Sequence, residues 1–189
     1  MNRQELIMRF SLRTLTDTQL KITHMPLKES AVLLAFIERN NELCLLLTKR
    51  SQHLRHHPGQ ISFPGGKHDV EDENLKTTAI RETQEELGIE FDDIDLFGEL
   101  PFHDTITGFR IKPYLGFVDQ RANITANVGE VSDVIEVPIK TFLFNPTHFM
   151  LPIIRPNLTV NVYFKPSQGH AIWGATAAII EQVRLLLED

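Results

Sequence analysis

Three glutamates, Glu82, Glu85 and Glu86, stand close together in a segment whose apolar positions repeat at helical spacing. At about 100° per residue, Glu86 lies roughly 40° to one side of Glu82 and Glu85 roughly 60° to the other. Carboxylates in a last helical turn oppose the helix dipole, and Glu82 repels Glu86 at i,i+4, so the arrangement is costly without a cation. Hard oxygen ligands suit Mg²⁺ or Mn²⁺. The spacing predicts a divalent metal site; a Glu-rich face that is simply solvated is the alternative.

The helix that carries these glutamates is predicted over residues 74–87. Asp72 or Asn74 is the expected N-cap, and Gly88 is the expected left-handed terminator. The positions predicted to face the core are Leu75, Ala79, Ile80, Thr83 and Leu87. The three glutamates are therefore expected beside the apolar stripe, in a sector of roughly 100°.

Short apolar runs with turn signals predict the strands around this helix. Residues 31–37 and 43–48 flank Asn40-Asn41, which is typical of a hairpin turn. A basic, histidine-rich loop then leads to a short strand at 60–63 and a tight turn at Pro64-Gly65-Gly66. Further strands are expected at 94–100, 109–118, 134–137 and 158–164, and a last helix at 174–187. Strands mixed with two substantial helices indicate an α/β layer fold.

Length and composition fit one compact domain. With 189 residues, 42% apolar and 23% charged, the chain is expected to form a single domain over 1–189, with 1–29 as an N-terminal extension. Cys44 is the only cysteine, so an intramolecular disulfide and a thiolate metal cluster are excluded, and a cytoplasmic location is expected. No apolar run approaches the length of a membrane span, and the net charge of −6 disfavours nonspecific nucleic-acid binding.

The region 65–89 resembles the Nudix box. It begins Gly65-Gly66-Lys67 and continues Arg81-Glu82-Thr83-Gln84-Glu85-Glu86-Leu87-Gly88-Ile89. Two departures stand out: the loop holds one extra residue, so either Asp72 or Glu73 takes the first acidic position, and Thr83 replaces an aliphatic residue. The resemblance implies a Nudix-type α/β/α sandwich with a mixed central sheet, and metal-dependent hydrolysis of a diphosphate.

The same resemblance suggests roles for individual residues. Glu82, Glu85 and Glu86 would hold Mg²⁺ or Mn²⁺ while water attacks a phosphorus atom. Arg81, four residues before Glu85, would orient that carboxylate, unless the two form an ordinary helix ion pair. Glu130 occupies a loop where family members often place an acidic residue near the metals, and a solvated loop glutamate is the alternative. The general base stays open among a box glutamate, Glu130 and a histidine.

A second string, upstream of the box, is similar to the signature of the coenzyme A pyrophosphatase subfamily of Nudix hydrolases. It comprises residues 46–51, Arg55, Gly59 and residues 63–66, and it runs directly into the box. The resemblance implies cleavage of coenzyme A or acyl-coenzyme A to 3′,5′-ADP and a 4′-phosphopantetheine product. The substrate-binding candidates are Lys49, Arg50, Ser51, Arg55, Phe63, Gly65 and Gly66.

Charge supports this interpretation, because the cations of the string are concentrated in an otherwise acidic chain and arginine suits bidentate contacts with phosphate. Solvated loop charges are the alternative for each cation alone. Adjacent histidines on a polar loop are expected to be solvated or to face phosphate rather than to bind a metal, and this applies to His53, His56 and His57. Residues 172–176 extend the resemblance to the tail, where Trp173 is expected in the core rather than on a ligand.

Other functions are compatible with the sequence. The substrate of such a hydrolase could instead be ADP-ribose, a dinucleotide or a nucleoside triphosphate. Diphosphate isomerases of the superfamily use a catalytic cysteine, but Cys44 falls inside a predicted strand. A binding module without turnover is disfavoured by the complete carboxylate set. The expected partner is a small molecule rather than nucleic acid or membrane, with the protein a monomer or homodimer.

Overall fold

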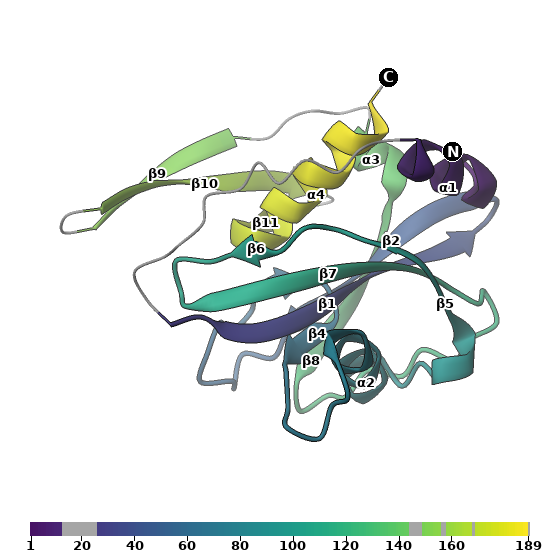
Figure 1. The fold of residues 1–189 in the computed structure, drawn as a ribbon, viewed down its shortest axis with the longest axis horizontal. Coiled ribbons are helices and arrows are strands. Elements are labelled where there is room, and N and C mark those ends of the chain that lie inside the picture. The colour runs from purple at the N-terminus through teal and green to yellow at the C-terminus, as the bar shows by residue number, and fades with distance from the viewer. Residues whose placement is uncertain (13–25, 144–148, 156–157, 168, 189) are drawn as a thin grey trace.

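A computed structural model describes residues 1–12, 26–143, 149–155, 158–167 and 169–188 (Figure 1). Runs of strands are separated by single helices along these ranges. Their order is α1 (Arg3–Ser11), β1 (Lys28–Arg39), β2 (Glu42–Arg50), β3 (Ile61–Ser62), β4 (Gly65–Lys67), α2 (Leu75–Leu87), the 3₁₀ turn η1 (Phe91–Asp93), β5 (Ile94–Glu99), β6 (His103–Asp104), β7 (Phe109–Val118), β8 (Val131–Pro138), α3 (Ile139–Leu143), β9 (Phe149–Arg155), β10 (Leu158–Ser167), β11 (His170–Trp173) and α4 (Gly174–Leu187).

The central sheet has the strand order β3-β2-β1-β7-β5. Strand β4 pairs with β1, β6 with β7 and β8 with β2. β1 and β7 run parallel, whereas the other pairs are antiparallel. The predicted mixed sheet is therefore confirmed.

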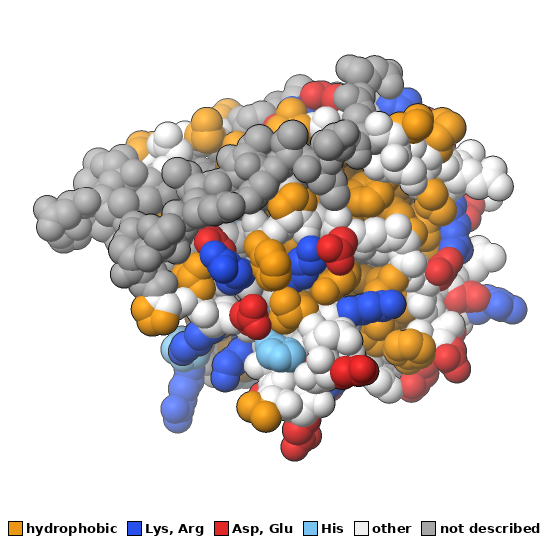
Figure 2. All heavy atoms as spheres, in the orientation of Figure 1, with side chains coloured by type: hydrophobic (Ala, Val, Ile, Leu, Met, Phe, Trp, Pro, Cys, Tyr) orange, Lys and Arg blue, Asp and Glu red, His pale blue; other side chains and the backbone are white. Residues whose placement is uncertain are grey.

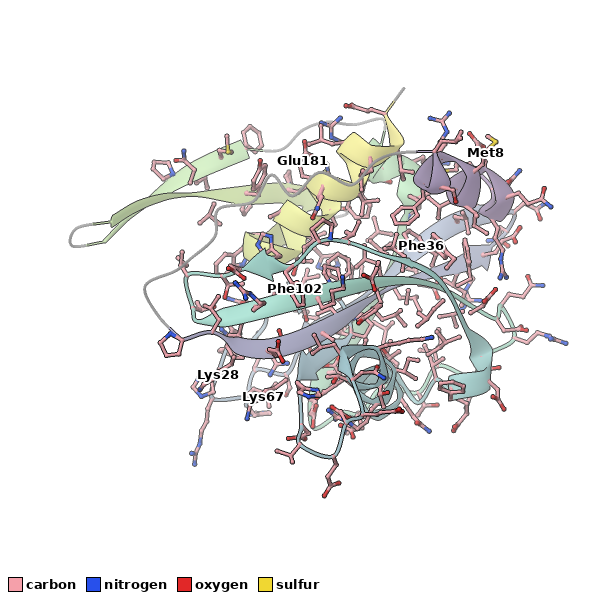
Figure 3. The ribbon with its side chains drawn as sticks, viewed as in Figure 1. Met8, Lys28, Phe36, Lys67, Phe102 and Glu181 are labelled. Atoms are coloured by element: carbon pink, nitrogen blue, oxygen red, sulfur yellow. The ribbon has the colours of Figure 1, made fainter. Side chains whose placement is uncertain are left out.

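Both faces of the sheet are covered, as alternation along β1 shows. Leu34 and Phe36 point into a core shared with α1 and α4, while Leu33 and Ala35 point into a second core shared with α2. Successive side chains of a strand face opposite ways, so a strand buried on both faces is apolar throughout. Figure 1 shows α2 on one side of the sheet and α1 and α4 on the other, and Phe36 points toward the latter in Figure 3. The α/β/α sandwich is confirmed.

Local sequence signals account for the best-predicted elements. Asn40 and Asn41 both have positive φ, at 51° and 62°, as the tight hairpin between β1 and β2 requires. Helix α2 begins after Asn74, whose side chain accepts a hydrogen bond from the Thr77 amide at 3.0 Å, so Asn74 rather than Asp72 is the N-cap. Gly88 ends the helix at φ 65°.

The turn predicted at Pro64-Gly65-Gly66 is wrong, because residues 65–67 form strand β4 against β1. Gly65 has φ 149°, and a Cβ at this position would overlap the Ala31 carbonyl oxygen and Val32 of β1. Close approach of two backbones, rather than a reversal of the chain, explains the glycine.

Several elements were not predicted. They include β6, α3 and the three-stranded sheet β11-β10-β9, of which only 158–164 was expected. Strands β9 and β10 extend beyond the sandwich at the left of Figure 1. Helix α1 lies inside the expected extension, yet its Leu6 is fully buried in the core with α4. None of the helices in the described ranges has the length and apolar character needed to cross a membrane.

Candidate functional site

Helix α2 packs on the sheet through the positions that its periodicity predicted. Ala79, Thr83 and Leu87 are fully buried. Thr83, which stands where the Nudix pattern has an aliphatic residue, donates its hydroxyl to the Ala79 carbonyl at 2.7 Å. The extra polar group is therefore satisfied within the helix, and the direction of the glutamates is unaffected.

Glu82 lies against strand β4. The space beside the Gly66 backbone is filled by the Glu82 carboxylate, because a Cβ on residue 66 would overlap the Glu82 carboxylate atoms. Arg81 Nη1 lies 3.1 Å from Glu82 Oε1. Burial raises the pKa of Glu82 more than the charge and hydrogen bond of Arg81 lower it.

Glu86 is the most deeply buried of the three glutamates, with 3% of its side chain exposed. Its Oε2 accepts a hydrogen bond from the Thr48 hydroxyl at 3.4 Å, and Arg50 Nη1 lies 3.9 Å from its Oε1. Burial raises the pKa of Glu86 to about 8, because the opposing effect of Arg50 is outweighed by burial and by the negative charges of Glu82 and Glu130.

Glu85 lies on the outer side of the helix, with half of its side chain exposed. Arg81 Nη1 donates a hydrogen bond to Glu85 Oε2 at 3.1 Å, which is the contact expected from the i,i+4 spacing. Among the described residues, no three His, Cys, Asp or Glu side chains lie close enough together to share one ion. The structure thus brings Glu82 and Glu86 together and leaves Glu85 with Arg81.

Arg81 is held by Asp72, and this contact distinguishes Asp72 from Glu73, the two candidates for the first acidic position of the box. Arg81 Nε and Nη2 donate to the two Asp72 carboxylate oxygens at 2.8 and 2.9 Å. The Thr78 hydroxyl donates to the same carboxylate at 2.8 Å. These hydrogen bonds, those from Arg81 above all, hold the pKa of Asp72 well below its usual range. Glu73 is exposed, so Asp72 is the acidic residue that orients Arg81.

The donor set fits a divalent cation. Glu86 is a buried carboxylate with one long hydrogen bond and a guanidinium 3.9 Å away, and Glu82 adds a second carboxylate nearby. Ionised groups removed from water need close counter-charges, which these contacts supply only in part. An oxygen-seeking cation beside Glu82 and Glu86 would supply the missing charge.

The loop that carries Glu130 is tied to the end of α2. Asn127 N donates to the Glu86 carbonyl at 2.9 Å, and Ser51 N donates to the Glu130 carbonyl at 2.7 Å. Glu130 is exposed, and its charge contributes to the raised pKa of both Glu82 and Glu86. The structure therefore gathers this loop, the end of β2 and the end of α2 at one place.

The substrate-binding candidates separate into exposed and buried groups. Lys49 and Arg50 end β2 and are half-buried, while Arg55 is exposed in the following loop. Ser51 is buried, with 5% exposed. Phe63 is 2% exposed and its side chain belongs to the apolar core, so this ring is not placed to contact a ligand. Gly65 and Gly66 lie on β4, where Gly65 faces β1 and Gly66 lies beside the Glu82 carboxylate.

Two contributors to the site were missed by the sequence analysis. Thr48 is fully buried and lies on the same face of β2 as Cys44 and Leu46. The alternation of side chains between the two faces of the strand was the signal that could have identified it. Ser62 on β3 lies opposite Thr48 in the sheet register, which no local pattern indicates. Trp173 is 40% exposed at the start of α4, so its predicted core position is wrong.

An α/β/α sandwich in which a glutamate-bearing helix follows a glycine strand is the arrangement that the resemblance to the Nudix box implied, and the family comparison agrees. The family model described as NUDIX domain matches residues 27–150. This chain belongs to the Nudix family, whose hydrolases generally use divalent metal ions.

Its relatives are bacterial Nudix hydrolases. The protein named uncharacterized Nudix hydrolase NudL from Pectobacterium atrosepticum is 37% identical over 77% of this chain and 76% of its own. NudL of Yersinia enterocolitica is 38% identical over 82% and 78% of the two chains. The chain is accordingly a hydrolase, and its substrate is a separate question.

Solved structures agree on the fold. DR0079 from Deinococcus radiodurans matches with a TM-score of 0.55 at 15% identity, covering 89% of this chain and 90% of that one. The NUDIX domain of Shewanella oneidensis NrtR, solved with ADP-ribose, matches with a TM-score of 0.53 at 18% identity and full coverage of both chains. At these identities the likeness concerns the fold alone.

Proposed function

We propose that this Nudix hydrolase cleaves the diphosphate bond of coenzyme A and its thioesters, yielding 3′,5′-ADP and a 4′-phosphopantetheine product. The observation that carries the proposal is the approach of Arg50 to Glu86, with Nη1 and Oε1 3.9 Å apart. Arg50 belongs to the string that resembles coenzyme A pyrophosphatases, and Glu86 belongs to the Nudix box. Two separate sequence signals therefore meet at one site.

Glu82 and Glu86 are the proposed metal ligands, with Glu85 joining them after a change of side-chain direction. A Mg²⁺ or Mn²⁺ ion bound there would neutralise charge on the diphosphate and lower the pKa of the attacking water. The protein's own contribution is to fix the carboxylates. Asp72 holds Arg81, and Arg81 in turn contacts Glu82 and Glu85.

The cations are proposed to bind the phosphates of the substrate. Arg50 would contact the diphosphate, and Lys49 and Arg55, which lie at the same end of β2 and in the following loop, would contact further phosphate oxygens. Guanidinium groups make paired hydrogen bonds to phosphate oxygens, and coenzyme A carries a ribose phosphate in addition to the diphosphate.

On the face drawn in Figure 2, acidic and basic side chains are interspersed, so this view shows no continuous basic surface of the kind that nucleic acid requires.

The general base is proposed to be one of the carboxylates that converge on this end of α2. Glu130 is one candidate, because its exposed side chain follows a loop anchored to the Glu86 carbonyl. A box glutamate is the other. A base must reach the attacking water within hydrogen-bonding distance, which a carboxylate beside the proposed metal ligands could do.

Separation of reaction products tests the substrate assignment. Purified protein with Mg²⁺ or Mn²⁺ is expected to convert coenzyme A to 3′,5′-ADP and phosphopantetheine, and ADP-ribose, a dinucleotide and a nucleoside triphosphate serve as competing substrates. Intact coenzyme A alongside turnover of one of these would overturn the substrate and leave the Nudix activity standing.

A matched pair of variants tests the metal site. Glu82→Gln is expected to lower kcat by at least 10²-fold to 10³-fold, roughly the scale of losing one strong electrostatic contact in an active site. Glu90→Gln changes an exposed glutamate just beyond the helix and should leave kcat unaltered. Retention of most activity in Glu82→Gln would disprove the metal site.

The proposed unit is one domain over 1–189 acting in the cytoplasm as a monomer or homodimer. Leu6 of α1 is buried in the same core as Ile179 of α4, which ties the amino-terminal helix to the sandwich. Analytical ultracentrifugation would distinguish the two assembly states.

A further inference from the structure

A pair of hydroxyl groups, one fully buried and one half-buried, lies beside Glu86. Thr48 is fully buried, and its Oγ1 lies 3.4 Å from Glu86 Oε2. Ser62 Oγ lies 3.3 Å from Thr48 Oγ1, and the Ser62 carbonyl lies 3.4 Å from the same atom. The pair comes from β2 and β3, whose register places Thr48 opposite Ser62.

The proton count of this group allows one ordered arrangement when Glu86 is ionised. A threonine hydroxyl has a single proton to donate, and a carboxylate is a stronger acceptor than a carbonyl. Thr48 therefore donates to Glu86 Oε2 and accepts from the Ser62 hydroxyl, which has a proton of its own. The opposite oxygen of Glu86, Oε1, faces Arg50 at 3.9 Å.

We propose that Thr48 is a positioning residue that directs the Glu86 carboxylate toward the metal, with Ser62 fixing the direction of the Thr48 hydroxyl. The proposal rests on the metal site of the proposed function and adds two residues outside the Nudix box to it. Groups that hydrogen-bond to metal ligands orient them, and their loss commonly lowers metal affinity or activity by about 10-fold to 100-fold.

The strand geometry makes this role specific. Cys44 and Leu46 precede Thr48 on the face of β2 that packs against α2, and both are apolar core residues. The hydroxyl at the next position on this face lies within hydrogen-bonding distance of the charged group of Glu86. Valine would fill the same volume and suit a strand better, so packing alone does not explain a threonine here.

The test compares Thr48→Val, which removes the hydroxyl at nearly constant volume, with Thr48→Ser, which keeps it. Mn²⁺ affinity is measured without substrate, by electron paramagnetic resonance of the free ion. Thr48→Val is expected to bind Mn²⁺ about 10-fold to 100-fold more weakly, and Thr48→Ser within about threefold of the parent protein. Thermal unfolding of the metal-free variants confirms that each is folded.

Two results would overturn the proposal: parental Mn²⁺ affinity in Thr48→Val, or equal losses in the valine and serine variants, which would indicate packing. If Thr48→Val does not fold, Ser62→Ala decides the question. It is expected to weaken Mn²⁺ binding about 3-fold to 10-fold, as loss of one hydrogen bond would, and parental affinity in that variant would contradict the proposal.

Activity assays separate this inference from the proposed substrate. A parent protein that binds Mn²⁺ and leaves coenzyme A intact would refute the substrate while the Thr48 comparison stands. A parent protein that binds no Mn²⁺ would refute both the metal site of the proposed function and the positioning role of Thr48.

Discussion

The Glu82 carboxylate occupies the space that a side chain on Gly66 would need. Gly66 pairs with Ala31 of β1, so its backbone is fixed in the sheet and cannot move aside easily. The glycine is required because the Glu82 carboxylate, a proposed metal ligand, packs directly against the strand. Lys67, labelled in Figure 3, marks the end of this strand near α2.

Gly66→Ala should therefore displace the Glu82 carboxylate. We expect Mn²⁺ affinity to fall by roughly 10-fold or more, the scale on which a misplaced metal-site group acts. Isothermal titration with Mn²⁺ would measure the loss, and circular dichroism would check the fold.

A double-mutant cycle tests whether Gly66 acts through Glu82. In the Glu82→Gln background, Gly66→Ala should produce a smaller further loss of Mn²⁺ affinity, because residues in direct contact are not additive. Fully additive losses would show that the alanine disturbs the site by another route.

Asp72→Asn should destabilise the metal-free protein at neutral pH by about 2 kcal/mol, because Arg81 loses its paired carboxylate contacts. Arg81 lowers the pKa of Asp72 in the folded state. The ionised carboxylate therefore stabilises the fold above the unfolded-state pKa, about 3.9, and this contribution is lost as pH falls below that value. Urea unfolding of parent and variant at pH 7 and pH 3 would show the difference shrinking at the lower pH.

Glu73→Gln is the control for this prediction. Glu73 is the neighbouring acidic residue and is exposed. The free energy of unfolding of the Glu73→Gln variant should therefore match that of the parent protein within about 0.5 kcal/mol at both pH values. Equal destabilisation by the two variants would contradict the assignment of Asp72 to Arg81.

Arg55→Gln should raise KM for coenzyme A about 3-fold to 10-fold with little change in kcat. The exposed guanidinium would bind ground state and transition state equally, and loss of such binding appears in KM. Lys140→Gln is the matched control, because Lys140 is an exposed cation paired with Glu42 at the opposite end of β2. Steady-state kinetics at fixed ionic strength would measure both, and an unchanged KM in Arg55→Gln would remove it from the site.

Cys44→Ala should retain hydrolysis within about twofold. Cys44 is 6% exposed and lies among the apolar residues between β2 and α2, and burial raises the pKa of its thiol. A nucleophilic cysteine needs access and a lowered pKa, so the isomerase alternative is disfavoured. The initial rate and the thermal midpoint would be recorded together; loss of activity in a folded variant would revive that alternative.

The sequence by itself determined the elements that local chemistry specifies. The Asn74 cap, the Gly88 terminator and the 3.6-residue periodicity define α2, and the pair Asn40-Asn41 defines the hairpin. Each of these signals acts within a few residues, so it can be recognised without knowing the rest of the fold. The resemblance to the Nudix box likewise comes from one continuous stretch, residues 65–89.

Tertiary structure decided which groups meet. Asp72 and Glu73 are adjacent in sequence, and only packing of the loop on Arg81 separates the buried one from the exposed one. Phe63 looked like part of a binding string, yet its ring, just after β3, lies in the core. Short elements such as β4 carry too few residues for a periodic signal and depend on pairing with β1.

The surroundings of Glu86 show the division most clearly. Helical spacing determined that Glu82 and Glu86 share a face, but Thr48 reaches Glu86 across 38 positions of sequence, through the packing of β2 against α2. Rotation about side-chain bonds, which spacing does not fix, turns Glu85 toward Arg81. Local propensity thus placed the carboxylates on one helix, and strand register together with side-chain packing decided how each of them is held.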